Sequence, residues 1–397
     1  MARGLHLGVR RSGGMAAMKT TIRPPTLAPG EVAEARIAPH GGLGTATLAP
    51  AGDGIAYASR LLHRALSDLG GGDPMLIELG ATGAEPVTLR TRMQFLARLA
   101  RLQSLHRVNW MLFTHVGIAR AQLRVPKAWR RPYAVMLHGI ESWDHALEPE
   151  RLAAMREARL RIAISAHTAR RVAAAHPSLP PIDTCLLALL PDEEHPDRVP
   201  GDVRVDFGPH AVVIVGRMSS AERYKGHDQL ILAWPRVLAE VPDATLVMVG
   251  RGDDVQRLHE KAAAIGVSRS VHFTGFLPDA AVRAVLRHAA VFAMPSRGEG
   301  FGLVYLQAMR AGVPCLGSRD DAAGDVIIDG ETGLLVPHQD PEAIAGAVAR
   351  LLTDDGMRRR FGEAGKRRFE SVFTYPRFRA RLAGLLSRGF PAAKTDR

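Results

Sequence analysis

Short apolar runs alternate with longer amphipathic stretches along most of the chain. In the first half such runs predict strands over residues 44–49, 74–79, 108–113, 133–138 and 160–165, and residues 185–190 have the same strand-length apolar character. The stretch 55–69 instead places four apolar residues on one face of a helix: Ile55, Ala58, Leu62 and Leu66. Strands that are apolar throughout and separated by helices are typical of a parallel sheet buried on both faces. We therefore expect an α/β domain in this half.

The same alternation resumes at residue 211. Strands are expected over 211–216, 244–250, 271–275, 291–295, 313–318 and 332–337, and helices over 226–240, 253–265, 279–289, 341–354, 355–370 and 373–386. Between the two halves, residues 191–210 are rich in proline, glycine and acids, which is the composition of a linker. Two doubly wound domains joined by a linker bind a ligand in the cleft where the carboxyl ends of their strands face each other.

The 397 residues are too many for one ordinary core, and the pattern divides them into five segments. We expect a disordered extension (1–35), a first Rossmann-like domain (36–195), a linker (196–210), a second Rossmann-like domain (211–372) and a final helix with a basic tail (373–397). Residues 1–18 lack the continuous apolar centre of a signal peptide, and Met15 or Met18 is an alternative start. No apolar run approaches the roughly 18 residues of a membrane-spanning helix. Cys185 and Cys315 lie in apolar runs and are interpreted as reduced core residues of a cytoplasmic protein.

The net charge of +12 is concentrated at the two ends. Residues 1–30 hold five basic residues and no acid, and residues 356–397 hold twelve basic residues and three acids, so the rest is close to neutral. Nucleic-acid binders interleave aromatics with basic residues over a working face, and aromatics are only 5% here, which disfavours that class. Terminal charge suits an anionic membrane surface or is simply solvated. The amphipathic stretch 89–105, with Arg90, Arg92, Arg98 and Arg101, is either a helix lying on a membrane or a core helix with solvated arginines.

The stretch PSRGEGFGLVYLQAMRAG, residues 295–312, places a glutamate between glycines just ahead of a helix that should begin at Gly302 or Leu303. Glycines let the backbone turn tightly and let a ligand approach without meeting a Cβ atom. Free N–H groups at a helix start attract phosphate or sugar oxygens, and Glu299 can accept hydrogen bonds from sugar hydroxyls. On its glycines alone, however, the stretch is better explained as an ordinary strand-to-helix turn with a solvated acid.

A second motif, VGRMSSAERYKG at residues 215–226, places Arg217 at the end of a strand and Lys225 at the start of a helix. A planar guanidinium and a compact ammonium can together clamp a diphosphate. Either residue alone is typical of a protein surface. Together with the glutamate-bearing turn and the two-domain pattern, they indicate a phosphate-binding cleft.

These residues resemble the retaining GT-B glycosyltransferases of family four, the glycosyl transferases group 1, which include many bacterial polysaccharide and glycolipid transferases. The resemblance covers residues 40–390 and is strongest over 216–231, 295–318 and 325–336. It implies two Rossmann-like domains facing each other across a cleft, with the last helix crossing back to the N-terminal domain. The C-terminal domain would bind a sugar nucleotide and the N-terminal domain would receive the acceptor.

The resemblance also implies roles for single residues of the C-terminal domain. Arg217 and Lys225 match the positions that neutralise the donor diphosphate, and Glu299 matches the first glutamate of the EX7E signature, which contacts the donor sugar. The backbone N–H groups of Gly300, Phe301, Gly302 and Leu303 would lie near sugar and phosphate oxygens. The segment that ends at Phe276 would lie beside the base. Gln307 replaces the second glutamate of the signature, so it keeps the size and one acceptor but loses the charge. We expect it to contact ribose with a loss on the order of 1 kcal/mol of donor binding.

In the N-terminal domain the resemblance points to the loop 50–54, with Gly52 and Gly54, as the glycine-rich loop near the reaction centre. Residues 41–44 (GGLG) are a competing candidate. His138, at a strand end, resembles a histidine that contacts the donor sugar, although a histidine in this position is as often structural. His115 and Glu141 are weaker candidates.

By this resemblance the protein is a hexosyltransferase that moves a sugar, with retention, from GDP-mannose or a UDP-sugar to a hydroxyl of a glycan or lipid-linked acceptor, in polysaccharide or glycoconjugate synthesis. We expect it to be cytoplasmic, peripheral at the inner face of the membrane, and to need no cofactor or metal. The pairs Asp253–Asp254 and Asp320–Asp321 are interpreted as helix caps or loop residues. A non-catalytic sugar-nucleotide-binding protein is an alternative that Gln307 supports. A nucleotide-dependent oxidoreductase is disfavoured because no G-x-G-x-x-G follows a first strand with an acid about 20 residues later.

Overall fold

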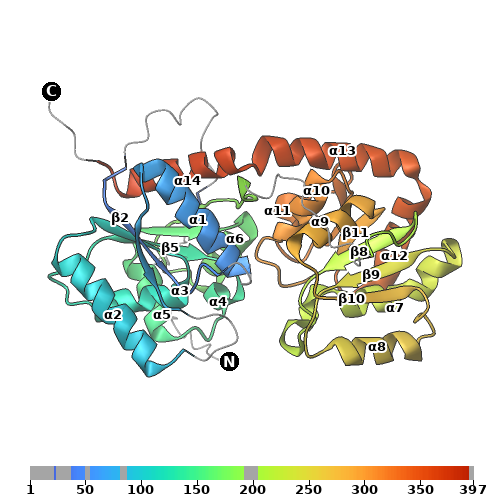
Figure 1. Ribbon diagram of the computed structural model, residues 1–397, viewed down its shortest axis with the longest axis horizontal. Coiled ribbons are helices and arrows are strands. Elements are labelled where there is room, and N and C mark those ends of the chain that lie inside the picture. Colours follow the sequence, from blue (N-terminus) through green and yellow to red (C-terminus); the bar gives the residue numbers. More distant parts are fainter. Residues whose placement is uncertain (1–21, 24–36, 50–53, 81–86, 192–203, 393–397) are drawn as a thin grey trace, which may run out of the picture.

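Two α/β lobes lie side by side in the structure, a computed structural model, and a pair of helices runs along the top of both (Figure 1). The structure describes residues 22–23, 37–49, 54–80, 87–191 and 204–392. Every strand pairing in both sheets is parallel, as expected for strands that are apolar throughout.

The N-terminal lobe is built on a sheet of order β1-β7-β6-β5-β4-β2-β3. Its elements are β1 (Ile22–Arg23), β2 (Gly41–Thr45), α1 (Gly54–Gly70), β3 (Met75–Glu78), α2 (Leu89–Ser104), β4 (Trp110–Phe113), α3 (Val116–Ala119), the 3-10 helix η2 (Arg120–Arg124), β5 (Tyr133–Leu137), α4 (Ile140–Trp143), α5 (Pro149–Glu157), β6 (Leu160–Ala163), α6 (Ala166–Ala175) and β7 (Ile182–Thr184). Alternate residues of β4 and β5 join cores on opposite faces of this sheet, one formed with α1 and the other with α2, α3, α5 and α6. Burial on both faces explains why these strands are apolar throughout.

The C-terminal lobe is built on a sheet of order β10-β9-β8-β11-β12-β13. Its elements are β8 (Ala211–Val215), the 3-10 helix η4 (Ser220–Lys225), α7 (His227–Glu240), β9 (Thr245–Val249), α8 (Val255–Ala264), β10 (Val271–Gly275), α9 (Asp279–His288), β11 (Val291–Met294), α10 (Leu303–Arg310), β12 (Cys315–Ser318), α11 (Ala323–Val326), β13 (Gly333–Val336), α12 (Pro341–Thr353), α13 (Asp355–Val372) and α14 (Tyr375–Gly389). Each strand and helix predicted for this half is present, with ends displaced by at most three residues.

The first predicted strand lies at a different place. β2 spans Gly41–Thr45 rather than 44–49, because its glycines make room for the large side chains of β4. A Cβ atom on Gly41 would lie 2.3 Å from the Trp110 ring, and one on Gly44 would lie 2.6 Å from the Phe113 ring. Residues 41–44 are therefore a buried strand, and their interpretation as a glycine-rich loop is wrong.

Three further sequence predictions need correction. The apolar run 185–190 is buried but forms no strand, since β7 ends at Thr184 and the backbone that follows is bonded by side chains of other segments. Two residues of the predicted disordered extension form β1, which pairs with β7. The end of the predicted linker belongs to the C-terminal lobe, because Phe207 is buried there and its carbonyl accepts a hydrogen bond from the Thr245 hydroxyl.

The C-terminal helices connect the two lobes. α13 covers the C-terminal lobe and α14 continues over the N-terminal lobe beside α1 (Figure 1). The Tyr375 hydroxyl donates to Asp68 of α1 at 2.6 Å, and the Arg388 guanidinium pairs with Asp183 of β7 at 2.9 Å. The predicted crossing of the last helix is thus confirmed. In the part of the chain that the structure describes, no helix is both long and apolar enough to cross a bilayer.

Candidate active site

The two lobes meet where the loop 295–302 of the C-terminal lobe reaches the end of β5. A Cβ atom on Gly300 would lie 1.8 Å from the carbonyl oxygen of His138, so only glycine allows this backbone contact. The Thr168 hydroxyl donates to the Gly300 carbonyl oxygen at 3.2 Å, and the His167 N–H donates to Asp325 at 2.7 Å. The fold therefore brings His138 and the glutamate-bearing turn together at the carboxyl edges of both sheets.

Lys225 and Glu299, which lie 74 residues apart in the sequence, form an ion pair at this edge. Lys225 Nζ is 3.0 Å from Glu299 Oε1, and each side chain is only 16% exposed. Burial works to lower the pKa of Lys225, but the charges of Glu299 and Glu222 outweigh it and hold that pKa above its ordinary value. Lys225 is therefore a fixed positive charge in a largely dry position.

Arg217 contacts a residue that the sequence analysis missed. Its guanidinium donates to Glu222 Oε1 at 2.6 Å, and the Arg217 side chain is 60% exposed whereas that of Glu222 is 16% exposed. The other carboxylate oxygen, Glu222 Oε2, is buried and has no hydrogen-bond partner in the described part of the chain. Because Glu222 also acts on Lys225, one carboxylate partly neutralises both predicted phosphate-binding cations. In the sequence, the only indication for Glu222 is that it lies between Arg217 and Lys225.

The turn that carries Glu299 is held by a second buried acid. The Glu299 N–H donates to Asp321 Oδ2 at 3.2 Å, and the Glu299 carbonyl accepts from the N–H of Ala322. Asp321 Oδ1 also accepts from the N–H of Ala323 at 2.9 Å. Burial, and then the charge of Glu299, raises the pKa of Asp321 to about 7. From the sequence, the pair Asp320–Asp321 is expected to cap a helix or line a loop, and no sequence pattern links Asp321 to Glu299.

The start of α10 is shaped by its glycine. Gly302 adopts the left-handed conformation (φ 86°), and a Cβ atom there would lie 2.5 Å from the Tyr305 ring. Within the described residues, no hydrogen bond occupies the N–H groups of residues 300–303. The Phe301 side chain is buried and packs edge-on against Phe373, so only its backbone can face a ligand. These amides are the helix-start donors that the sequence predicted for Gly300, Phe301, Gly302 and Leu303.

Two other predicted donor contacts, Gln307 and Phe276, form no hydrogen bond with Lys225 or Glu299 in the described residues. Gln307 is half-buried on α10, and its side chain makes no hydrogen bond within the described part of the chain. Phe276 is 63% exposed just beyond the carboxyl end of β10, with the Arg251 guanidinium 5.0 Å from its ring centroid. Neither contacts Lys225 or Glu299, and their proposed contacts with ribose and base stay predictions.

His138 is buried, and one of its ring nitrogens is occupied. His138 Nε2 lies 2.6 Å from the Thr114 carbonyl, so this nitrogen donates, and within the described residues no hydrogen bond occupies Nδ1. Glu141 Oε1 accepts from the N–H groups of His138 and Gly139 at 2.8 and 3.0 Å, which orients the turn. His115 Nδ1 accepts from the Gly117 N–H and caps α3, and this is a structural arrangement.

Other predicted positions are placed as follows. Gly54 is the first residue of α1, and a Cβ atom added there would meet nothing within 4 Å, whereas Gly52 and the loop 50–53 lie outside the described residues. Asp253 accepts from Ser220, and Asp254 pairs with Arg223 and Arg257. In the described ranges no group of three or more histidines, cysteines or carboxylates is arranged to hold a metal ion.

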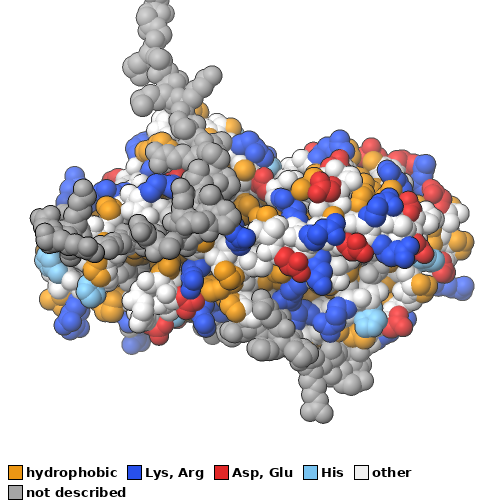
Figure 2. Space-filling view, turned by 90° about the horizontal axis from the view of Figure 1, so that it is seen from above, with side chains coloured by type: hydrophobic (Ala, Val, Ile, Leu, Met, Phe, Trp, Pro, Cys, Tyr) orange, Lys and Arg blue, Asp and Glu red, His pale blue; other side chains and the backbone are white. Residues whose placement is uncertain are grey.

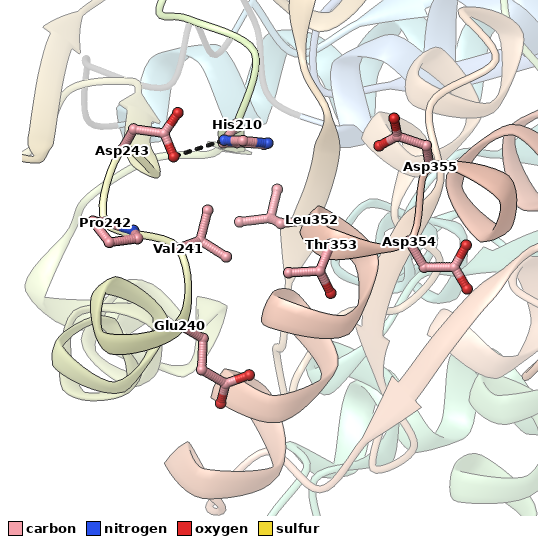
Figure 3. Close-up of a pocket in the computed structure, with 9 residues that line it drawn as sticks. All are labelled: His210, Glu240, Val241, Pro242, Asp243, Leu352, Thr353, Asp354 and Asp355. Carbon is pink, nitrogen blue, oxygen red and sulfur yellow. Dashed lines mark hydrogen bonds and ion pairs between the residues drawn. The ribbon is translucent and has the colours of Figure 1, made fainter.

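A cavity of about 610 Å³ lies elsewhere on the C-terminal lobe (Figure 3). His210 and Asp243, hydrogen-bonded at 2.8 Å, flank it on one side, and Asp354 and Asp355 lie on the other. His210 and Asp243 precede β8 and β9, so this cavity is at the amino edge of the parallel sheet. Lys225 and Glu299 lie at the carboxyl edge, where open α/β sheets bind ligands. The cavity is therefore not part of the candidate site.

The sequence model of the family described as "Glycosyl transferases group 1" matches residues 206–368. The C-terminal domain belongs to this family. Its matched range includes Arg217, Lys225 and Glu299.

Characterised relatives of this group 1 domain include two mycobacterial mannosyltransferases. A GDP-mannose-dependent alpha-(1-6)-phosphatidylinositol monomannoside mannosyltransferase of Mycolicibacterium smegmatis is 36% identical over 238 residues, 56% of this chain and 61% of the relative. A phosphatidyl-myo-inositol mannosyltransferase of Mycobacterium leprae is 39% identical over 155 residues, which cover 39% of this chain and 40% of the relative. The chain thus spans less than two thirds of the length of either relative.

Solved structures with the same fold cover more of the chain. A sucrose-phosphate synthase from Thermosynechococcus elongatus matches with a TM-score of 0.70 and 20% identity, over 88% of this chain and 98% of its own. HepE from Anabaena, solved with UDP and glucose, matches with a TM-score of 0.68 and 18% identity, over 88% of this chain and 100% of its own. At these identities the likeness concerns the fold, and it confirms the GT-B arrangement of two Rossmann-like domains.

Proposed function

We propose that this protein is a glycosyltransferase that transfers a hexosyl group from a nucleoside-diphosphate sugar to a hydroxyl acceptor, with retention of the anomeric configuration. The observation that carries the proposal is the largely buried Lys225–Glu299 ion pair, at the turn that contacts His138 across the two lobes. A diphosphate leaving group needs positive charge in a partly dry place, and a sugar needs an acceptor for its hydroxyls. The ion pair supplies both groups, because Lys225 Nζ and Glu299 Oε1 lie 3.0 Å apart.

The charges of the site suggest how a donor would bind. Lys225 would turn from Glu299 toward the diphosphate, and the released Glu299 carboxylate would accept from sugar hydroxyls. Arg217, which is exposed, would exchange Glu222 for a phosphate oxygen. The N–H groups of residues 300–303 would add uncharged donors at the start of α10. His138 would face the sugar through Nδ1, since its Nε2 is held by Thr114.

GDP-mannose is the first donor to test, because the M. smegmatis relative and two M. tuberculosis relatives are named for their dependence on it. UDP-sugars are the alternative, since UDP and glucose are bound in HepE. A lipid-linked polyol is the proposed acceptor class, because the mycobacterial relatives are named for phosphatidylinositol lipids. None of the proposed chemistry requires a metal ion, since Lys225, Arg217 and the helix-start amides can carry the diphosphate charge.

Gln307 favours one second candidate, a protein that binds a sugar nucleotide without transferring the sugar. Its side chain lacks the negative charge expected at this position and makes no hydrogen bond in the described residues that would fix its orientation. Incubation with labelled GDP-mannose and UDP-glucose separates the two candidates. Transfer or slow hydrolysis supports the enzyme, whereas saturable binding without either supports the second candidate.

The decisive variant is Lys225→Ala. Removing a charge that stabilises the leaving group should lower kcat/KM by about 10³-fold while circular dichroism stays unchanged. Lys366→Ala, on the exposed surface of α13, is the matched control and should keep normal turnover. Near-normal turnover of Lys225→Ala would contradict the diphosphate role. The configuration of the product, read by NMR, tests retention separately.

A further inference from the structure

Helix α2 exposes large apolar side chains on the outside of the N-terminal lobe. Leu89 is 76% exposed and Met93 is 58% exposed, and Leu105, directly after the helix, is 56% exposed. The opposite side of the same helix buries Phe95, Leu99 and Gln103 against the sheet. α2 lies at the end of the lobe away from the C-terminal lobe (Figure 1), and the other described segments of the chain leave these apolar side chains exposed.

The same exposed half of α2 is basic and free of acids. Residues 87–107 contain five arginines and no aspartate or glutamate. Arg90, Arg98 and Arg101 are exposed between the apolar side chains, and in the described ranges no carboxylate pairs with any arginine of this helix. We call Leu89, Arg90, Met93, Arg98, Arg101 and Leu105 the α2 face.

Several other arginines of the protein pair with carboxylates. On the neighbouring segments Arg120, Arg124 and Arg130 each pair with a glutamate. Over α13, Arg358 pairs with Asp355 and Arg367 lies 3.9 Å from Glu363. Figure 2, which looks onto α13 and α14, shows basic side chains interspersed with acidic ones there. The α2 face differs because it combines unpaired arginines with exposed leucine and methionine.

The chemistry of the α2 face selects one kind of partner. Burying exposed apolar side chains away from water is favourable. The arginines beside them need a partner that also carries negative charges next to its apolar part. The interface of an anionic bilayer offers acyl chains and phosphate groups together. A second copy would bring arginine against arginine across a two-fold axis. Nucleic acid would be bound by aromatic stacking, and the α2 face has no aromatic residue.

We propose that the α2 face docks on the surface of a membrane that contains anionic lipids. The start of α2 lies at the carboxyl edge of the N-terminal sheet. In a parallel sheet α2 begins, after β3, at the same edge where β5 ends before His138. The first residues of the α2 face, Leu89 and Arg90, therefore lie at the edge of the sheet that carries His138.

The test is co-sedimentation of the full-length protein with vesicles of phosphatidylcholine alone or with about 30% phosphatidylglycerol. We expect binding only to the anionic vesicles, weakened by raising the salt concentration. The triple variant Arg90→Gln, Arg98→Gln and Arg101→Gln should lower the partition coefficient about 100-fold, at about fivefold per arginine. The double variant Leu89→Ser and Met93→Ser should lower it by at least tenfold with all arginines kept.

A matched control separates the α2 face from net charge. The triple variant Arg359→Gln, Lys366→Gln and Arg367→Gln removes the same charge from exposed positions of α13 and should change the partition coefficient less than threefold. An equal loss in this control, unchanged binding of either α2 variant, or no binding of the wild type to anionic vesicles would each overturn the proposal. The measurement needs no sugar transfer, so its outcome is independent of the proposed function.

Discussion

At the scale of single residues, the site is a set of charges that compensate one another. Lys225 is held by Glu299, Arg217 by Glu222, and the Glu299 turn by Asp321. Buried charges are stable only when paired, so each charge meant for a ligand needs an internal partner in the free protein. Binding of an anionic donor would exchange these internal partners for phosphate and sugar.

Asp321 gives the site a dependence on pH. Burial raises its pKa to about 7, above the ordinary value of 3.8, so the native state holds a proton that the unfolded chain releases. The stabilisation from this proton is full below about pH 4 and is lost as pH rises through 7. We expect Asp321→Asn, which cannot ionise, to gain in Tm relative to wild type between pH 5 and pH 8, by roughly 5 °C.

Thermal unfolding of both proteins at several pH values checks this expectation. Asp320→Asn is the control, because the same change at the neighbouring position removes an acceptor for the His338 N–H rather than one for the Glu299 N–H. A Tm difference between Asp321→Asn and wild type that stays constant from pH 5 to pH 8 would show that Asp321 is already ionised across this range.

Gln307 stands where the family that this sequence resembles has the second glutamate of its signature. Restoring the charge with Gln307→Glu should tighten donor binding about fivefold, on the order of 1 kcal/mol, if the side chain accepts from ribose hydroxyls. Calorimetric titration with the donor measures the change. Gln94→Glu, exposed on α2, makes the same change in charge far from the site. Equal affinity of Gln307→Glu and wild type would argue against the ribose contact.

At the scale of elements, the loop before α10 carries the contact between lobes. The Gly300 backbone lies against the His138 carbonyl, and a methyl group cannot fit at 1.8 Å. We expect Gly300→Ala to move the loop or separate the lobes, lowering kcat/KM by at least about 100-fold because reacting groups are displaced by an ångström or more. Donor hydrolysis and transfer are the measurements.

The control for this variant is Gly346→Ala in α12, where an added Cβ atom meets nothing within 4 Å. Alanine favours a helix interior over glycine, so this control should keep its activity and gain up to about 1 kcal/mol of stability. Normal activity of Gly300→Ala would mean that the close contact between the lobes is not needed for the reaction.

At the scale of the whole molecule, α14 binds the two lobes into one unit. Arg388, on α14, pairs with Asp183, whose side chain is only 4% exposed. Arg388→Met leaves that carboxylate buried without its cation, and because Arg388 is itself 40% exposed we expect a loss of only about 1–2 kcal/mol. This corresponds to a fall in Tm of about 2–8 °C in a scanning calorimeter. Arg377→Met, exposed on the same helix, should leave Tm within about 1 °C.

The order of strands and helices could be predicted from the sequence, because the spacing of apolar residues shows which faces of each element are buried. β4 and β5 are apolar throughout since both faces are covered, and the amphipathic helices of the C-terminal half were located to within a few residues. β2 was displaced because its glycines carry no apolar signal, although they accommodate Trp110 and Phe113. The run 185–190 was assigned to a strand because burial alone does not distinguish strand from loop.

The sequence by itself determined the two-domain α/β architecture, the match of the C-terminal domain to the group 1 family, and the candidate cations and glutamate, since periodicity and motif spacing are local properties of the chain. Only the tertiary structure decided that Lys225 meets Glu299, that Glu222 and Asp321 support them, and that α2 exposes leucine and methionine. These pairings join residues up to tens of positions apart. Their distances and burial follow from how the sheets and helices pack, which no local pattern encodes.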